Sequence, residues 1–425
     1  MLDRKFIVEN AGAVRQNCAN RGMDADVDRF VELVTQCREK STEVQDLNRQ
    51  ANAVSKTIGG AKTDEEREQR KNEGRALRDK KDAMQVELDA MEAELATIQR
   101  MIPNMAHPEA PIGKDDKANL EIKRGKNVPR EFDFKPLDHV ELAEKHDMID
   151  FEAGAKTTGA GFYFLKNDAV LLELALQQFV IQKLVGKGFT PTTTPDLARQ
   201  EILEGIGFNP RGSETQIYSI ENTDLCLVAT AEITLGGYLS GETVMDTDLP
   251  KKMCGISHCF RTEAGAAGRA SRGLYRVHQF TKVEMFAFTL PDQSEEILND
   301  FREIECEIFD ELGIPYRVVD TSTGDLGAPA YRKYDLEAWM PGRGDGGEWG
   351  EVTSTSNCND YQARRLNVRY KIKDAKGTHF VHTLNGTAMA LSRGIISVME
   401  NGQQADGSIE IPEVLQPFMG KAKIG

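Results

Sequence analysis

The sequence lacks any run of about 18 uncharged apolar residues, the length that a membrane-spanning helix requires. Its most apolar stretch, residues 169–185, is interrupted by Glu173 and Lys183. The amino terminus also lacks the apolar core and small-residue site of a secretory signal, because charged residues stand among its first positions. We therefore expect no membrane association and a cytoplasmic location.

Paired cysteines are lacking as well. The 7 cysteines are an odd number scattered without a CxxC pair, which argues against a disulfide framework. Cys254, His258 and Cys259 lie close enough in sequence to raise the question of a metal. However, adjacent strand residues point to opposite faces, and no second ligand pair follows. We expect cytosolic thiols and no zinc site.

Positive charge is in short supply. The chain of 425 residues carries 53 Lys and Arg against 68 Asp and Glu, a formal net charge of −15 that repels nucleic acid at long range. Residues 67–81, the basic segment, depart from this average. They contain seven cationic side chains, namely Arg67, Arg70, Lys71, Arg75, Arg78, Lys80 and Lys81. We expect any contact with RNA to come from such a local segment.

Two heptad patterns lie in the amino-terminal quarter of the chain. In residues 30–58 and again in residues 77–102, apolar positions recur alternately three and four residues apart. Gly59 and Gly60 lie between the two runs and are typical of a helix end. The spacing predicts two helices that fold back as an antiparallel coiled-coil hairpin over about residues 28–102.

Such a hairpin has two interpretations. Most heptads mediate dimerisation or serve a structural role, and periodicity alone does not exclude either. The basic segment near the turn favours an arm that binds RNA. At about 1.5 Å rise per residue, helices of about 30 residues would project on the order of 40 Å.

From about residue 132 onward, apolar runs typical of strands follow one another with few helical segments between them. Helices are expected at residues 169–185, 294–312 and 388–400. Strands in runs with few crossover helices indicate an antiparallel sheet flanked by helices. The predicted fold class is α+β.

Two glycine-rich loops lack the features of a nucleotide-binding loop. Residues 265–273, GAAGRASRG, have no Lys-Ser or Lys-Thr ending. Residues 342–350, GRGDGGEWG, do not open a helix after a strand. Neither loop supports a P-loop or a dinucleotide-binding fold.

The segment at residues 260–286, FRTEAGAAGRASRGLYRVHQFTKVEMF, carries a more specific pattern. Arg261 and Glu263 stand two residues apart at the end of a predicted strand, so both side chains would share a face and address one ligand. The chain then returns as a second strand with Phe280 and Glu284. A strand, a loop opened by arginine and a second strand resemble the second signature motif of class II aminoacyl-tRNA synthetases.

Other segments resemble the same class. Residues 384–418 look like its third motif, in which a strand leads into a helix bearing Arg393, and residues 188–199 with Pro195 look like the first motif. The amino-acid sequence is similar to that of the bacterial seryl-tRNA synthetase family over nearly the whole chain, including TAE at residues 230–232.

This resemblance implies an organisation for the whole protein. It implies an amino-terminal tRNA-binding domain at residues 1–110, a class II catalytic domain at residues 111–425, and a homodimer whose interface includes the first motif. It also implies that the coiled-coil arm grips the long variable arm of serine tRNA.

The resemblance also implies roles for the ATP site. The catalytic residues would be Arg261, clamping the α-phosphate and the serine carboxylate, and Arg393 at the γ-phosphate. Glu351 and Ser354 would hold Mg²⁺, and Phe280 would stack on the adenine. The full predicted ATP-binding set is Arg261, Thr262, Glu263, Val277, Phe280, Glu351, Val352, Thr353, Ser354 and Arg393. From sequence alone, a core aromatic on a strand is nearly as good an interpretation of Phe280.

For L-serine, a polar pocket rejects alanine, which lacks the hydroxyl. The residues that resemble the serine site of the family are Thr230, Ala231, Glu232, Arg261, Glu284 and Thr387. One carboxylate would take the ammonium and another the hydroxyl, without an assignment between them. Thr387 stands where the bacterial family usually has serine; it keeps a hydroxyl, and its methyl narrows the pocket.

The predicted activity is formation of seryl-adenylate and pyrophosphate from L-serine and ATP, followed by transfer of serine to tRNA(Ser) and, where it occurs, tRNA(Sec). A paralogue that binds RNA or protein without catalysis is one alternative, but it would be expected to lose phosphate or metal residues. Arg261, Glu263, Glu351 and Arg393 are all present. A ligase acting on a carrier protein is another alternative, and the intact arm counts against it.

Overall fold

The computed structural model describes residues 1–208, 216–263 and 272–425. The chain divides into two compact units, Met1–Met105 and Ala106–Gly425. Most of the glycine-rich loop predicted at residues 265–273 lies outside the described residues.

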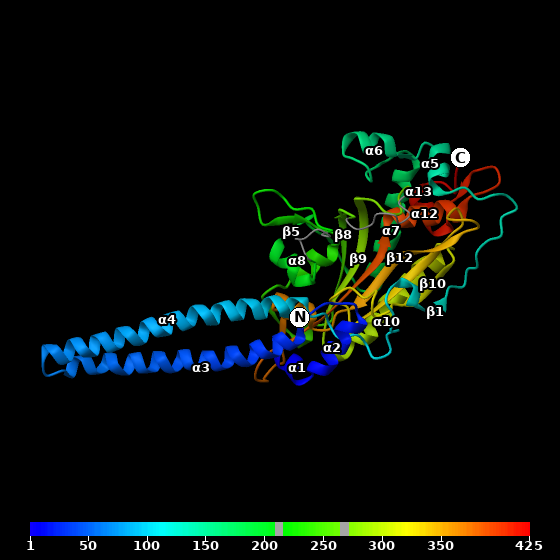
Figure 1. The fold of residues 1–425 in the computed structure, drawn as a ribbon. Helices are drawn as coiled ribbons and strands as arrows, with labels where there is room; N and C mark the ends of the chain where they lie inside the picture. The colour runs from blue at the N-terminus through cyan, green and yellow to red at the C-terminus, as the bar shows by residue number, and fades with distance from the viewer. Residues whose placement is uncertain (209–215, 264–271) are drawn as a thin grey trace. The chain divides into compact units, whose positions relative to one another are not determined.

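The first unit is helical. It consists of α1 (Arg4–Glu9), α2 (Ala11–Asn20), α3 (Val27–Thr57) and α4 (Asp64–Met101). The two long helices, α3 and α4, lie side by side in opposite directions (Figure 1). Thr63 caps α4, because its hydroxyl oxygen accepts a hydrogen bond from the N–H of Glu66 at 3.1 Å. The predicted helical hairpin is therefore present, and its supercoiling as a coiled coil stays a prediction.

The contact between α3 and α4 follows the predicted heptads over much of its length. Phe30 and Leu88, for example, are buried. Towards the tip the buried residue of α4 is Gly74, whereas Leu77 is only partly buried. A Cβ atom on Gly74 would lie 3.6 Å from Cγ1 of Val54, so the glycine lets the two helices approach closely.

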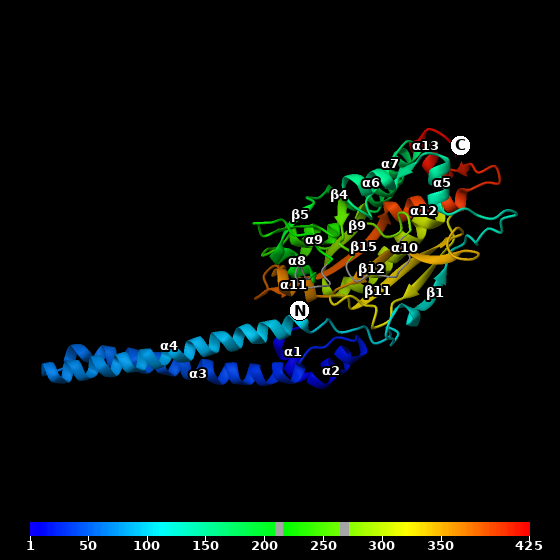
Figure 2. The ribbon, with the colours of Figure 1, turned by 45° about the horizontal axis from the view of Figure 1, so that its top comes forward.

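The second unit is built on an eight-stranded sheet with the order β1-β10-β11-β12-β15-β9-β8-β4. Its strands are β1 (Leu120–Arg124), β4 (Thr190–Thr193), β8 (Lys251–Phe260), β9 (Gln279–Thr289), β10 (Tyr316–Asp320), β11 (Arg332–Met340), β12 (Glu348–Asn357) and β15 (His382–Ala390). Figure 2 shows β9, β15, β12 and β11 side by side. Neighbouring strands are antiparallel except that β4 pairs parallel to β8.

Helices flank this sheet. They are α5 (His139–Lys145), α6 (Phe151–Thr157), α7 (Asp168–Gly186), α8 (Gln200–Ile206), α9 (Ala231–Gly237), α10 (Ser294–Glu311), α11 (Tyr361–Leu366), α12 (Leu391–Gly402) and α13 (Gln416–Met419). Short strands complete the unit: β2 (Ile149–Asp150), β3 (Phe164–Leu165), β5 (Leu197–Arg199), β6 (Leu225–Leu227), β7 (Thr243–Met245), β13 (Arg369–Lys371), β14 (His379–Phe380), β16 (Ile409–Glu410) and β17 (Lys423–Ile424). The predicted α+β class is confirmed.

Two hydrophobic cores hold the unit together. In the larger core, α7, α10 and α12 pack against the sheet. The smaller core joins α8, α9 and α11 to the strands β8 and β9. Together the cores hold α9 against β8 and β9, and α12 against β9 and β15.

Helix α7 has two apolar sides. By length and composition it could cross a membrane, but one side, including Leu172, Leu176 and Val180, is fully buried in the larger core. On the other side Leu171 and Leu174 remain 42% and 55% exposed. An apolar helix side that is left uncovered is typical of a protein contact surface.

The chain has 2 tryptophans, and both lie in one hairpin of the sheet. Trp339 on β11 and Trp349 on β12 are paired in register. Their rings meet edge to face with centroids 5.1 Å apart. The guanidinium of Arg317, on β10, stacks over the ring of Trp349 at 5.5 Å. Side chains from β10 and β11 therefore cover this ring.

Candidate active site

A cavity of about 290 Å³ opens where β8, β9, β12 and β15 meet α9 and α12. The residues lining it are Phe208, Thr230, Glu232, Arg261, Glu263, Tyr275, Arg276, Val277, Phe280, Lys282, Glu284, Glu351, Val352, Thr353, Ser354, Asn385, Thr387, Ala390, Ser392 and Arg393. Arg261 and Arg393, far apart in sequence, thus face one cavity. A cavity lined by many convergent charged groups is a typical binding site for a charged ligand.

Two predicted site residues do not line this cavity. Ala231 is fully buried in the smaller core. The backbone N–H of Thr262 donates a hydrogen bond to the carbonyl of Gln216 at 3.1 Å. Both are chain neighbours of residues that line the cavity.

Arg393 stands at the start of α12, where it is fixed by backbone and aromatic contacts. Its Nη1 donates to the carbonyl of Glu351 at 2.8 Å, and its Nε donates to the carbonyl of Tyr275 at 3.3 Å. The guanidinium also lies over the ring of Tyr275 at 4.6 Å. Burial lowers the pKa of Arg393, but Glu351 together with Tyr275, Glu263 and Asp335 raises it by more, so the net pKa is raised and the cation persists at any physiological pH.

Arg261 follows directly after β8. Its guanidinium lies 5.3 Å from the ring centroid of Phe280, and its Nε donates to the carbonyl of Ala229 at 3.4 Å. The prediction that Arg261 and Glu263 share one face of a strand was wrong, because β8 ends at Phe260 and Glu263 adopts a φ of 52°. Both side chains nevertheless line the cavity.

Glu263 meets a second cation of the site. Its carboxylate accepts a hydrogen bond from Nη1 of Arg276 at 2.6 Å, with both side chains mostly buried. A positive φ is uncommon for glutamate. Here it turns the carboxylate towards Arg276 instead of continuing the strand.

A buried polar cluster forms the inner end of the cavity. Glu284, 2% exposed, forms an ion pair with Lys282. Thr387, which faces Glu284 across the sheet, donates to its carboxylate at 3.4 Å and accepts from Nζ of Lys282 at 3.3 Å. Buried charges require such partners, because an unpaired charge is costly in a low dielectric.

Glu232 lies beside this cluster in the first turn of α9. Its Oε1 accepts hydrogen bonds from Gln362 at 2.8 Å and Asn385 at 2.9 Å. Burial, followed by repulsion from Glu284, raises the pKa of Glu232 to about 7. Thr230 caps this helix and accepts from the N–H of Glu232 at 3.2 Å.

Two side chains with oxygen atoms, Glu351 and Ser354, lie on β12 and line the cavity. Burial would raise the pKa of Glu351, but Arg393, Lys333 and Arg261 hold it below its usual range, so the carboxylate is ionised. Ser354 lines the same cavity, and its register partner on β11 is Asp335. A carboxylate and a hydroxyl suit Mg²⁺, which keeps most of its other ligands from phosphates and water.

The described residues hold no group of three or more His, Cys, Asp or Glu side chains that could bind a metal. In the sequence cluster that raised the zinc question, the ring of His258 is exposed and its Nδ1 lies 2.8 Å from Asp196, while Cys259 is fully buried.

Sequence reasoning missed several residues of the site. Lys282 could have been found, because Phe280, Lys282 and Glu284 alternate along β9 and all line the cavity. Asn385 and Tyr275 carry no such signal, since their contacts with Glu232 and Arg393 cross from one element to another.

Comparisons with known proteins define the class first. Residues 216–402 match the tRNA synthetase class II core domain (G, H, P, S and T), and residues 1–106 match the Seryl-tRNA synthetase N-terminal domain. The antiparallel sheet and the charged cavity are thus those of a class II aminoacyl-tRNA synthetase.

The particular family follows from the relatives. Serine–tRNA ligase of Rhodopirellula baltica is 62% identical over 420 residues, covering 99% of this chain and 98% of the relative. That of Treponema denticola is 58% identical over the full length of both chains. The crystal structure of seryl-tRNA synthetase from Pyrococcus horikoshii complexed with ATP matches with a TM-score of 0.90 and 37% identity, covering 100% and 99% of the two chains. The chain belongs to the seryl-tRNA synthetase family.

Proposed function

We propose that the cavity binds L-serine and ATP, forms seryl-adenylate, and passes the seryl group to tRNA(Ser). The observation that carries this proposal is the convergence of Arg261, Arg393 and Glu351 on one cavity in a chain of this family. The structure of a family member complexed with ATP, similar over its whole length, supports ATP as the nucleotide.

In the first step a serine carboxylate oxygen attacks the α-phosphorus of ATP. A new P–O bond forms while the bond from the α-phosphorus to the bridging oxygen breaks, and pyrophosphate leaves with the bonding electrons. Two anions must approach one another, so fixed cations lower the barrier. Arg261 serves the α-phosphate and the serine carboxylate with its planar fork, and Arg393 serves the γ-phosphate.

The adenine would occupy the outer part of the cavity. Phe280 offers an aromatic face, while Glu263 and the backbone at Val277 offer hydrogen-bonding groups for the base edge. In the second step a terminal ribose hydroxyl of tRNA attacks the carbonyl carbon of seryl-adenylate, and AMP leaves.

Serine is selected at the buried polar cluster. Glu232, Glu284 and Thr387 surround the inner end of the cavity, where an ammonium and a hydroxyl both find acceptors. Alanine would leave these buried groups unpaired, which is costly. The methyl group of Thr387 limits the room for the extra methyl of threonine.

Glu351 and Ser354 would hold Mg²⁺. The ion, when bound, neutralises charge on the phosphate oxygens. The ionised state of Glu351, maintained by Arg393 and Lys333, supports this assignment.

The wider assembly is part of the proposal. The uncovered apolar side of α7 supports a homodimer, and the basic segment on α4 supports binding of tRNA(Ser) by a coiled-coil arm within a domain of residues 1–110. Family membership supports a cytoplasmic enzyme that also serylates tRNA(Sec) where that tRNA occurs.

Amino-acid-dependent pyrophosphate exchange tests the activity across all twenty amino acids. Only serine is expected to support strong pyrophosphate exchange. Arg261→Ala should abolish this exchange, because the serine carboxylate and the α-phosphate of ATP lose the cation that both contact. Unchanged exchange in Arg261→Ala, with a melting temperature equal to that of the wild type, would refute the assigned clamp.

The same assays separate the alternatives. A paralogue without catalysis would show no exchange with any amino acid. A ligase for carrier proteins would exchange with serine but load a carrier protein in place of tRNA. Loading of tRNA(Ser) alone supports the proposal.

A further inference from the structure

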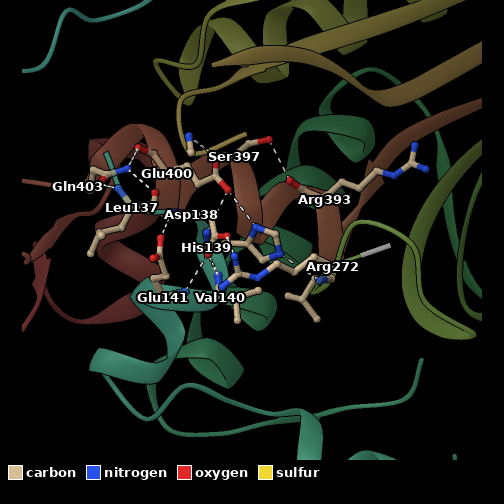
Figure 3. Close-up of polar contacts among 12 residues, drawn as sticks. Leu137, Asp138, His139, Val140, Glu141, Arg272, Arg393, Ser397, Glu400 and Gln403 are labelled. Atoms are coloured by element: carbon tan, nitrogen blue, oxygen red, sulfur yellow. Dashed lines mark hydrogen bonds and ion pairs between the residues drawn. The ribbon is translucent and has the colours of Figure 1, made fainter. Parts of the chain in front are cut away.

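A second group of buried polar side chains lies next to the triphosphate end of the cavity, outside its lining. His139 is the first residue of α5, and Glu400 lies on α12, the helix that carries Arg393. Their side chains are 8% and 2% exposed. Figure 3 shows His139 beside Glu400, with Arg393 farther along the same helix.

Glu400 joins two segments to α12. Its Oε1 accepts from the backbone N–H of His139 at 3.0 Å and lies 2.9 Å from the ring Nδ1, and its Oε2 accepts from the N–H of Gly342 at 3.0 Å. Gly342 precedes Arg343 in the turn between β11 and β12. A Cβ atom on Gly342 would lie 2.5 Å from Cα of Asp138, so the turn packs directly on the start of α5.

His139 joins a third segment. Its Nε2 accepts from the N–H of Leu274 at 3.1 Å, so this nitrogen carries no proton, and Nδ1 carries the proton that it donates to Glu400. Gly273 has a φ of 71°, and a Cβ atom there would lie 2.0 Å from Nε2 of His139. The chain before Tyr275 is therefore seated tightly on the imidazole.

The three joined segments all lead to one stack of side chains. Tyr275 lies between two guanidinium groups, with Arg343 over its ring at 4.3 Å and Arg393 at 4.6 Å. Its hydroxyl donates to the carbonyl of Glu351 at 3.1 Å. Tyr275 thus contacts both Arg393 and the strand that carries Glu351.

We propose that His139 and Glu400 are positioning residues for ATP, which fix the Arg343–Tyr275–Arg393 stack at the triphosphate end of the site. The inference rests on the proposed function for the identity of the nucleotide. We assign His139 and Glu400 no such role towards serine. The polar cluster at Glu232 and Glu284 lies on α9 and β9, and the hydrogen bonds of His139 and Glu400 described above reach neither element.

The test compares His139→Leu with His146→Leu. Both histidines belong to the α5 region, and His146 also makes a partly buried polar contact, its Nε2 lying 2.8 Å from the carbonyl of Gly407. His146 hydrogen-bonds to none of the three segments. We expect His139→Leu to weaken ATP binding, measured by calorimetry, by about 10- to 100-fold, the usual effect of a misplaced catalytic group. The KM for serine should change less than about threefold, and His146→Leu should resemble the wild type in both.

Two further variants keep the test decisive. His139→Gln retains one acceptor and one donor, so it should recover part of the ATP affinity. Glu400→Gln presents an amide N–H to the N–H of Gly342, so two donors face each other. We expect this variant to lose affinity for ATP but not for serine, and it provides the test if His139→Leu does not fold.

Equal ATP affinities in His139→Leu and His146→Leu would overturn the inference, as would parallel losses for ATP and serine, which indicate a general structural role. If Glu400→Gln binds ATP like the wild type, the inference also fails. Failure of the proposed function is distinguishable, because the wild type itself would then show no serine-dependent exchange.

Discussion

Glu232 illustrates how one carboxyl group can couple the proposed serine pocket to pH. Its folded pKa of about 7 lies above the ordinary value of 4.5, so the folded chain retains this proton after the unfolded chain has lost it. The resulting stabilisation is complete below about pH 4.5 and is lost as the pH rises to about 7, by up to about 3 kcal/mol.

Glu232→Gln mimics the protonated form at every pH, because its amide keeps one acceptor and gains a donor. We expect the melting temperature of this variant, relative to the wild type, to rise between pH 5 and pH 8. A pH-independent difference between the two melting temperatures would contradict the raised pKa.

At the residue scale, the sequence correctly predicted those cavity residues that lie within recognisable motifs. Arg261, Glu284 and Arg393 stand in matched motifs, and all three line the cavity. Asn385 and Tyr275 could not be predicted from the sequence, because a contact between elements depends on register and packing that no local pattern encodes. The conformation of Glu263 could not be predicted for a similar reason, since its positive φ accompanies an ion pair with Arg276, a residue 13 positions away.

Among the elements, the helical hairpin is the one proposed to bind tRNA, so its removal tests whether the two reaction steps can be separated. Deleting residues 55–78 removes the tip and most of the basic segment but leaves every residue that lines the cavity. We expect serine-dependent pyrophosphate exchange to stay near normal while charging of tRNA falls at least about 100-fold, because the cationic contacts to the phosphate backbone are lost.

Steady-state charging and exchange assays on the same preparation check this expectation. Equal loss of both activities would mean that the hairpin is structural. Wild-type charging by the deletion variant would exclude the arm from tRNA binding.

Element prediction succeeded where one signal dominated. The periodicity of residues 30–58 and 77–102 predicted α3 and α4, since a seam of apolar residues needs a partner helix. The helix expected at residues 388–400 begins later, at Leu391, because residues before it complete β15, where Met389 pairs with Val283. Pairing between strands thus overrides the helical propensity of alanine and methionine.

At the scale of the whole molecule, α7 presents an apolar side that the described residues of the second unit do not cover. Replacing Leu174 of α7 by glutamate places a charge in the proposed homodimer contact, where desolvation is costly. We expect this variant to sediment as a monomer at micromolar concentration, whereas Ile112→Glu, at an apolar position that is 75% exposed outside α7, should remain a dimer.

A monomeric wild type, or a dimeric Leu174→Glu variant, would contradict the proposed interface. The sequence indicated this contact only through the resemblance of residues 188–199 to the first motif, because hydropathy alone cannot tell which side of an apolar helix the core covers.

The confinement of both tryptophans to the hairpin of β11 and β12 has a practical consequence. Intrinsic fluorescence should follow the melting of the sheet-containing unit alone, while ellipticity near 222 nm, a signal of helices, should report on both units, because both contain long helices. Recording both signals during one denaturation would show whether the two units unfold together, with no label attached to the enzyme.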